Sequence, residues 1–263
     1  MAKIAIDCGH SRVTAGKRCL KSLDSNETKE WVLNDRVGDS LEQALKSAGH
    51  TVLRVDDTDG STDVSLADRV NKANSWGADA YISVHHNAGV NGGSGGGTVV
   101  YVAKSCSSKS VQMQNAVYKH AIADCKLKGN RSDGTLASNF YVIKNTKMPA
   151  ILIECGFMDS ATDIKYILDP DWSKDMGIAI AKGVCEVFGG TVNVESVFQP
   201  YVVRVTADEL NIRAGAGTKY EITGTIKDKG AYTIVEEKMN GNTKWGKLKS
   251  GIGWVSLQYT KRV

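Results

Sequence analysis

The chain has 263 residues, of which 41% are hydrophobic and 24% are charged. This is an ordinary composition for a globular protein with ample apolar material for a core, so no disulfide scaffold is needed. The length exceeds that of most single compact domains and favours two. The six cysteines occur without CxxC spacing, so we expect no structural zinc site made of four cysteines, and without a secretory signal we expect their thiols to be reduced.

Charge is unevenly distributed along the chain. Residues 200–263 contain 11 Lys and Arg against 6 Asp and Glu, whereas residues 1–199 contain 22 against 23. A basic C-terminal part suits a polyanionic partner such as nucleic acid, a membrane surface or an anionic cell-wall polymer. No stretch approaches the roughly 18 consecutive apolar residues of a membrane span, so we expect no membrane insertion.

The first ten residues, MAKIAIDCGH, contain neither the apolar region nor the cleavage site of a secretory signal. We therefore expect the protein to be made in the cytoplasm. If its substrate lies outside the membrane, a separate route must release it.

Apolar runs and helical spacing alternate through the first 190 residues. Strands are expected at residues 3–8, 51–55, 79–85, 98–102, 139–143 and 149–154. Helices are expected at residues 28–48, 65–76, 108–125 and 173–188. This alternation predicts an α/β fold with a mostly parallel twisted sheet flanked by helices.

The pattern changes after Gly190. Residues 190–200 are expected to form a linker or a lead-in strand, and residues 201–262 contain short strand candidates separated by turn residues. This spacing predicts a small all-β barrel. The predicted organisation is a first domain at 1–189, a linker at 190–200 and a second domain at 201–263.

Three residues with metal-binding or proton-transfer chemistry follow or end predicted strands: His10, His85 and Glu154. In open α/β sheets, functional sites gather at the carboxyl ends of the strands, so these side chains should meet at one edge. A catalytic zinc needs about three protein ligands and an open position, and two histidines with a carboxylate form a standard set. A glutamate of the first helix could complete the set, leaving Glu154 as the general base.

Several ordered segments over residues 2–188 resemble the zinc-dependent N-acetylmuramoyl-L-alanine amidases of the type-3 amidase family. They are AIDCGHS, EWVLN, LADRVNKAN, ADAYISVHHNA and NFYVIKNTKMPAILIECGF. The resemblance implies that His10, Glu30 and His85 bind Zn²⁺ and that Glu154 is the catalytic base. The family often has glycines in the loop after this histidine, whereas here the loop reads SRVTAGKRCLKSLDSNETKE, which leaves Glu27 as a rival to Glu30. His86 also departs from the small or apolar residue usual beside the ligand histidine.

The C-terminal part resembles a bacterial SH3 domain. The resemblance rests on ADELNIRAGAGTKY at residues 207–220, KWGK at 244–247 and GWV at 253–255. It implies binding to bacterial peptidoglycan and wall-associated polymers, which the basic charge also favours. An amidase with such a domain and no export signal resembles a bacteriophage endolysin, which acts on the cell wall after holin-type release.

Two alternatives remain at the level of sequence. The same metal chemistry would serve another zinc peptidoglycan peptidase, such as a carboxypeptidase that cuts wall peptides. The chain could also be a non-catalytic binder of cell wall or of nucleic acid. We expect no nucleic-acid partner, because the first domain is close to neutral and offers a poor phosphate surface.

Overall fold

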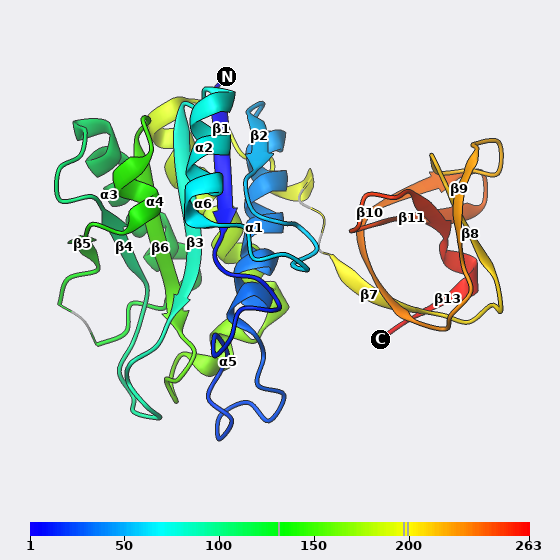
Figure 1. The fold of residues 1–263 in the computed structure, drawn as a ribbon, viewed down its shortest axis with the longest axis horizontal. Helices are drawn as coiled ribbons and strands as arrows, with labels where there is room; N and C mark the ends of the chain where they lie inside the picture. Colours follow the sequence, from blue (N-terminus) through cyan, green and yellow to red (C-terminus); the bar gives the residue numbers. More distant parts are fainter. Residues whose placement is uncertain (131, 197, 199) are drawn as a thin grey trace. The chain divides into compact units, whose positions relative to one another are not determined.

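The computed structural model describes residues 1–130, 132–196, 198 and 200–263 (Figure 1). The chain divides into two compact units, Met1–Val197 and Phe198–Val263. The linker predicted at 190–200 includes residues 197 and 199, which lie outside the described residues. Within that linker, Val194–Ser196 form a short 3-10 helix.

The described residues of the first unit form a six-stranded sheet of order β2-β1-β3-β6-β4-β5. Its strands are β1 (Lys3–Cys8), β2 (Thr51–Arg54), β3 (Ala80–Asn87), β4 (Val99–Val102), β5 (Thr135–Ala137) and β6 (Ala150–Phe157). Strand β1 pairs in parallel with β2 and β3, and β3 pairs in parallel with β6. Strand β4 runs antiparallel to β6 and parallel to β5. The prediction of a mostly parallel sheet is confirmed.

Helices cover both faces of this sheet (Figure 1). They are α1 (Glu30–Ser47), α2 (Leu66–Trp76), α3 (Ser108–Cys125), α4 (Tyr141–Asn145), α5 (Ile164–Ile167) and α6 (Pro170–Phe188). Alternate strand residues face opposite sides, so Ile4 and Ile6 join the core beneath α1, α3 and α6, whereas Ala5 joins the core beneath α2 and α4. The continuous apolar runs of β1, β3 and β6 arise because both of their faces are buried.

The strand predicted at residues 139–143 is wrong, because this segment begins helix α4. A strand would bury alternate side chains, whereas Phe140 and Tyr141 are exposed and the adjacent Val142 and Ile143 are both buried. A segment of five largely apolar residues is too short to show either the 3.6-residue period of a helix or the two-residue period of a strand. Packing against α2 and the sheet determines that it becomes helical. The short elements β5 and α5 were also missed.

The second unit is an antiparallel all-β unit, as predicted. Its strands follow the order β13-β7-β10-β11-β12-β8-β9. They are β7 (Tyr201–Val205), β8 (Leu210–Arg213), β9 (Ile222–Ile226), β10 (Ala231–Asn240), β11 (Thr243–Leu248), β12 (Trp254–Ser256) and β13 (Thr260–Arg262). They enclose a small core that includes Val203, Ile212, Ile234 and Val255. Among the described residues, no helix combines the length and the apolar character that crossing a membrane requires.

The topology of the first unit brings three chain segments to one edge of the sheet. Strands β1, β3 and β6 are parallel neighbours, so their carboxyl ends lie side by side. His85 and Glu154 are paired residues in the register of β3 and β6. The backbone N–H of Gly9, just beyond β1, donates to the carbonyl oxygen of Val84. This arrangement places the residues predicted to be functional within reach of one another.

Candidate active site

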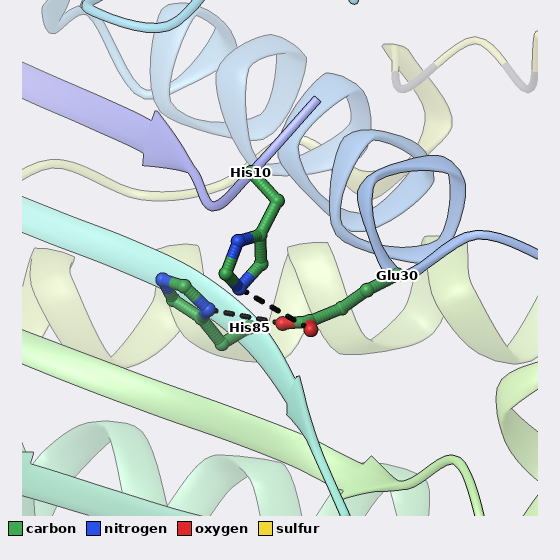
Figure 2. Close-up of side chains that lie close together, drawn as sticks. All are labelled: His10, Glu30 and His85. Atoms are coloured by element: carbon green, nitrogen blue, oxygen red, sulfur yellow. Dashed lines mark hydrogen bonds and ion pairs between the residues drawn. The ribbon is translucent and has the colours of Figure 1, made fainter. Parts of the chain in front are cut away.

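Three of the predicted site residues meet at this edge of the sheet. Figure 2 shows the side chains of His10, Glu30 and His85 directed toward one another. The His10 Nε2 atom lies 3.3 Å from Glu30 Oε2, and His85 Nδ1 lies 3.0 Å from Glu30 Oε1. One ligand atom from each residue lies within 4.8 Å of the other two. Two imidazole nitrogens and a carboxylate thus face a common point.

Each of these side chains comes from a different kind of element. His10 follows β1 and has a φ of 66°, which is uncommon for a residue other than glycine and marks a constrained position. Glu30 is the first residue of α1, and His85 lies on β3. Gly9 is required here, because a Cβ atom at that position would lie 2.0 Å from the Cε1 atom of the His85 ring.

The two candidate glutamates separate clearly. Glu27 precedes α1, and its carboxylate lies 3.5 Å from the Arg18 guanidinium and 3.8 Å from the Lys21 ammonium. It is not part of the group that Glu30 forms with the two histidines. Glu30, rather than Glu27, therefore occupies the third position of the candidate metal-binding group.

Glu154 lies on β6 beside this group. It lines the same cavity of about 230 Å³ as His10, Glu30 and His85. Its Oε2 atom is buried and has no hydrogen-bond partner within the described part of the chain. Burial raises the pKa of Glu154 to about 7. An unpartnered buried carboxyl oxygen is costly unless a reaction or a ligand uses it, which marks Glu154 as a group free to exchange a proton.

The electrostatics of the cluster favour a charged Glu30 carboxylate beside a neutral His10 imidazole. Burial alone would raise the pKa of Glu30, but the hydrogen bond and charge of His85, together with the charge of His10, lower it to about 2. Burial lowers the pKa of His10 to about 4. Burial also opposes the charged form of His85, yet the hydrogen bond to Glu30 raises its pKa above the usual range. Deprotonated carboxylate and neutral imidazole are the forms that bind metal ions, so Glu30 and His10 are favoured in those forms, whereas His85 would release its proton on binding one.

Asn34 and His86 both contact the Glu30 carboxylate, to which Asn34 Nδ2 donates at 3.5 Å. The Nδ1–H of His86 donates to Asn34 Oδ1 at 2.8 Å, and Asn34 Nδ2 donates to the carbonyl oxygen of Gly9 at 3.0 Å. The backbone N–H of His86 donates to Glu30 Oε1 at 3.3 Å. His86 is therefore not one of the candidate metal ligands, but its ring contacts Asn34 and it contributes to the same network.

Arg69 of α2 holds the chain segment that presents His10. Its buried guanidinium donates to Asp7 Oδ1 and to the carbonyl oxygens of Cys8 and His10. The second carboxylate oxygen of Asp7 accepts a hydrogen bond from Ser83 at 2.7 Å. Neither Arg69 nor His86 was predicted to take part in the site. The sequence does mark Arg69, because it is a charged residue next to Val70 in the apolar stripe of the helix predicted at residues 65–76.

The donor set of His10, Glu30 and His85 fits a divalent metal ion that accepts both nitrogen and oxygen ligands. A second group, formed by Cys8, Asp35 and Asp56, also has ligand atoms close together. There the Arg54 guanidinium already donates to Asp35 and Asp56, at 2.9 and 2.7 Å. The second group is thus an internal ion-pair network, whereas the first combines metal-binding atoms with an adjacent cavity.

Comparison with known proteins agrees with this geometry. Residues 4–186 match the N-acetylmuramoyl-L-alanine amidase family model, and residues 208–261 match the bacterial SH3 domain model. The chain is 27% identical over 220 residues to the N-acetylmuramoyl-L-alanine amidase CwlM of Bacillus licheniformis, covering 82% of each protein. It is 29% identical over 188 residues to the endolysin of Bacillus phage SPP1, covering 71% of this chain and 66% of the endolysin.

The fold has solved counterparts as well. The catalytic domain of CwlV, an N-acetylmuramoyl-L-alanine amidase from Bacillus (Paenibacillus) polymyxa var. colistinus, superposes with a TM-score of 0.64 at 26% identity. The match covers 73% of this chain and all of that domain. The family match spans more than half of the chain and includes the segments that carry the site. The chain therefore belongs to the N-acetylmuramoyl-L-alanine amidase family and carries a bacterial SH3 domain at its C-terminal end.

Proposed function

We propose that this peptidoglycan amidase hydrolyses the bond between N-acetylmuramic acid and L-alanine with the help of Zn²⁺ held by His10, Glu30 and His85. The observation that carries the proposal is the convergence of their ligand atoms within 4.8 Å, beside the unpartnered carboxyl oxygen of Glu154. Two nitrogens and one carboxylate favour zinc over magnesium or calcium, which prefer oxygen ligands.

A bound zinc ion would polarise the scissile carbonyl and lower the pKa of a water molecule. Glu154 would act as the proton carrier of the reaction. Its free Oε2 atom can accept the proton of the attacking water and then deliver it to the nitrogen of the departing alanine. Glu154 acts here through proton transfer alone, so the mechanism needs no covalent intermediate on the protein.

The supporting residues would keep the ligands in place. Asn34 and His86 restrict the Glu30 carboxylate, and Arg69 fixes the backbone that carries His10. Partners of this kind, which touch the ligand residues rather than the ion, orient metal ligands and commonly change metal affinity when they are removed.

We further propose that the SH3 domain holds the enzyme on peptidoglycan and wall-associated polymers, and that the protein serves as an endolysin. Similarity to the SPP1 endolysin and the basic charge of residues 200–263 support this role. In that role the protein would be made in the cytoplasm and would reach the wall after holin-type release. Fractionation of infected cells with and without a functional holin tests this part of the proposal.

Digestion of purified peptidoglycan tests the reaction itself. The amidase reaction releases peptides with new N-terminal L-alanine and leaves free lactyl groups on muramic acid. Cleavage confined to bonds between amino acids would instead identify a wall peptidase and would overturn the proposal.

Chelation tests the metal. We expect a strong chelator to abolish wall lysis and added Zn²⁺ to restore it. Full activity of a protein shown by elemental analysis to be free of metal would contradict the proposed role of the ion.

A further inference from the structure

Two cavities flank the candidate metal ligands. The first, of about 230 Å³, is lined by Lys17, Arg18 and Glu154, and we call it the 17–18 cavity. The second, of about 400 Å³, is lined by residues 63–66, and we call it the 63–66 cavity. His10 and His85 line both. A substrate whose scissile bond lies at these histidines can therefore reach both cavities.

The position of Glu154 indicates which part of the substrate occupies which cavity. Glu154 lines the 17–18 cavity and is absent from the lining of the 63–66 cavity. Hydrolysis of an amide requires a proton on the departing nitrogen, and a general acid must lie within hydrogen-bond reach of that atom. If Glu154 supplies this proton, the departing peptide lies on its side of the histidines. This step rests on the proposed function.

We propose that the 17–18 cavity binds the anionic stem peptide and that the 63–66 cavity binds the muramoyl sugar, with Lys17 selecting peptides that carry a free carboxylate near the scissile bond. In peptidoglycan the residue after L-alanine is a glutamate joined through its side chain, so its α-carboxylate is either free or amidated. A free carboxylate next to a lysine forms a charge-assisted contact that the amide cannot form.

The loop that carries Lys17 is anchored to the catalytic unit. The backbone N–H of Glu30 donates to the carbonyl oxygen of Lys17 at 3.0 Å, and Cys19 N–H donates to Thr28 at 2.8 Å. Lys17 is thus fixed by its backbone to the first residue of α1, which is itself a candidate metal ligand. Its side chain is exposed and available to a ligand. Arg18 lies 3.5 Å from Glu27, so part of its charge is already matched.

The 63–66 cavity has a different chemistry. Leu66 is 54% exposed there, and Val64 lines the same cavity. Asp63 and Ser65 add a carboxylate and a hydroxyl to the same wall. Apolar surface together with a few polar groups suits a sugar ring, which offers hydroxyls at its rim and C–H groups on its faces.

The experiment compares two soluble substrates with the full-length protein. Both are N-acetylmuramoyl tetrapeptides of L-Ala, D-Glu, L-Lys and D-Ala, and they differ only in whether the α-carboxylate of D-Glu is free or amidated. We expect wild type to prefer the free form and Lys17→Gln to lower kcat/KM for it by about fivefold to tenfold. The amidated form should change by less than about twofold, because it has no charge to lose.

Three variants serve as controls. Lys21 belongs to the same loop but lines neither cavity, so Lys21→Gln should leave both substrates unchanged. Lys17→Arg should retain the preference, because it keeps the positive charge. Leu66→Ala should lower activity without altering the ratio between the substrates. Equal losses on both substrates in Lys17→Gln, or no loss on either, would overturn the assignment.

A binding measurement separates this inference from the proposed reaction. The two tetrapeptides without sugar are titrated into wild type and Lys17→Gln by calorimetry, which requires no cleavage. Tighter binding of the free carboxylate to wild type, lost in the variant, supports the orientation even if a different bond is cut. Equal binding of both peptides to both proteins refutes the orientation while leaving the amidase reaction intact.

Discussion

The two units of this protein differ in whether their charged side chains are buried or exposed. In the catalytic unit, Asp7, Glu30 and Arg69 are almost completely buried. In the described part of the SH3 unit, no charged side chain is buried, and ion pairs such as that of Lys229 with Asp208 lie in solvent. Burying charge is costly and is sustained only where paired groups compensate for it. Buried, paired charges therefore occur in the first unit with the candidate active site, whereas the described charged side chains of the second unit lie in solvent.

The largest expected effect is on catalysis and leaves binding intact. Glu154→Gln keeps the shape of the side chain but cannot accept the proton, so wall lysis should fall by about 10²–10⁴-fold. The variant should still sediment with purified cell walls, because the SH3 unit is unchanged. Turbidity loss and a wall pull-down measure the two properties separately. Lysis at the wild-type rate would remove Glu154 from the mechanism.

The next effect concerns the stability of the catalytic unit. Asp7→Asn retains a polar group for Ser83 but removes the buried carboxylate that pairs with Arg69, leaving only the half-exposed Asp63 carboxylate 3.7 Å from the guanidinium. Breaking a buried pair on one side costs about 3–5 kcal/mol in free energy of unfolding. Urea denaturation followed by fluorescence measures this loss. A cost below about 1 kcal/mol would show that the pair is not needed to hold the backbone before His10.

Lowering the pH should weaken the same ion pair between Asp7 and Arg69. Burial would raise the pKa of Asp7, but Arg69, with further contributions from His85 and Ser83, holds it below its usual value. Asp7 binds a proton more readily in the unfolded chain than in the folded protein. The stabilisation that the Asp7 carboxylate provides is therefore fully present above its unfolded pKa of about 4, and it is lost as the pH falls toward its lower folded pKa. The free energy of unfolding of wild type should therefore fall more steeply below pH 4 than that of Asp7→Asn. Parallel curves would contradict the assignment.

The smallest effect is expected in the SH3 unit. Asp208→Asn breaks an ion pair of 3.0 Å whose aspartate side chain is 93% exposed. Solvent screening limits such pairs, so the free energy of unfolding should change by less than about 0.5 kcal/mol. Unfolding of the variant in urea, compared with wild type, checks this value. A loss comparable with that of Asp7→Asn would erase the contrast between the units.

Much of the catalytic fold was predictable because its central strands are unambiguous. The runs that form β1, β3 and β6 are apolar on both faces, and each is followed or ended by a polar residue. Parallel neighbours at one edge then bring His10, His85 and Glu154 together without further information. The choice between Glu27 and Glu30 was not predictable, because it depends on where α1 begins and on the path of the loop before it.

Other features depend on tertiary contacts that the sequence does not display. The segment that begins α4 has too few residues to establish a period, so its β-prone composition favoured the wrong element. The partner of Arg69 lies 62 residues away, and that of His86 lies 52 residues away. Neither contact follows from spacing within one element. Both became visible only through the arrangement of the sheet and its helices.

The most direct test of the account is the metal content of two matched variants. Purified wild type, Glu30→Ala and Glu27→Ala are dialysed against trace zinc, and their zinc content is measured by inductively coupled plasma mass spectrometry. The account predicts about one zinc per chain in wild type and in Glu27→Ala, and little in Glu30→Ala. Retention of zinc by Glu30→Ala, or its loss from Glu27→Ala alone, would contradict the proposed site.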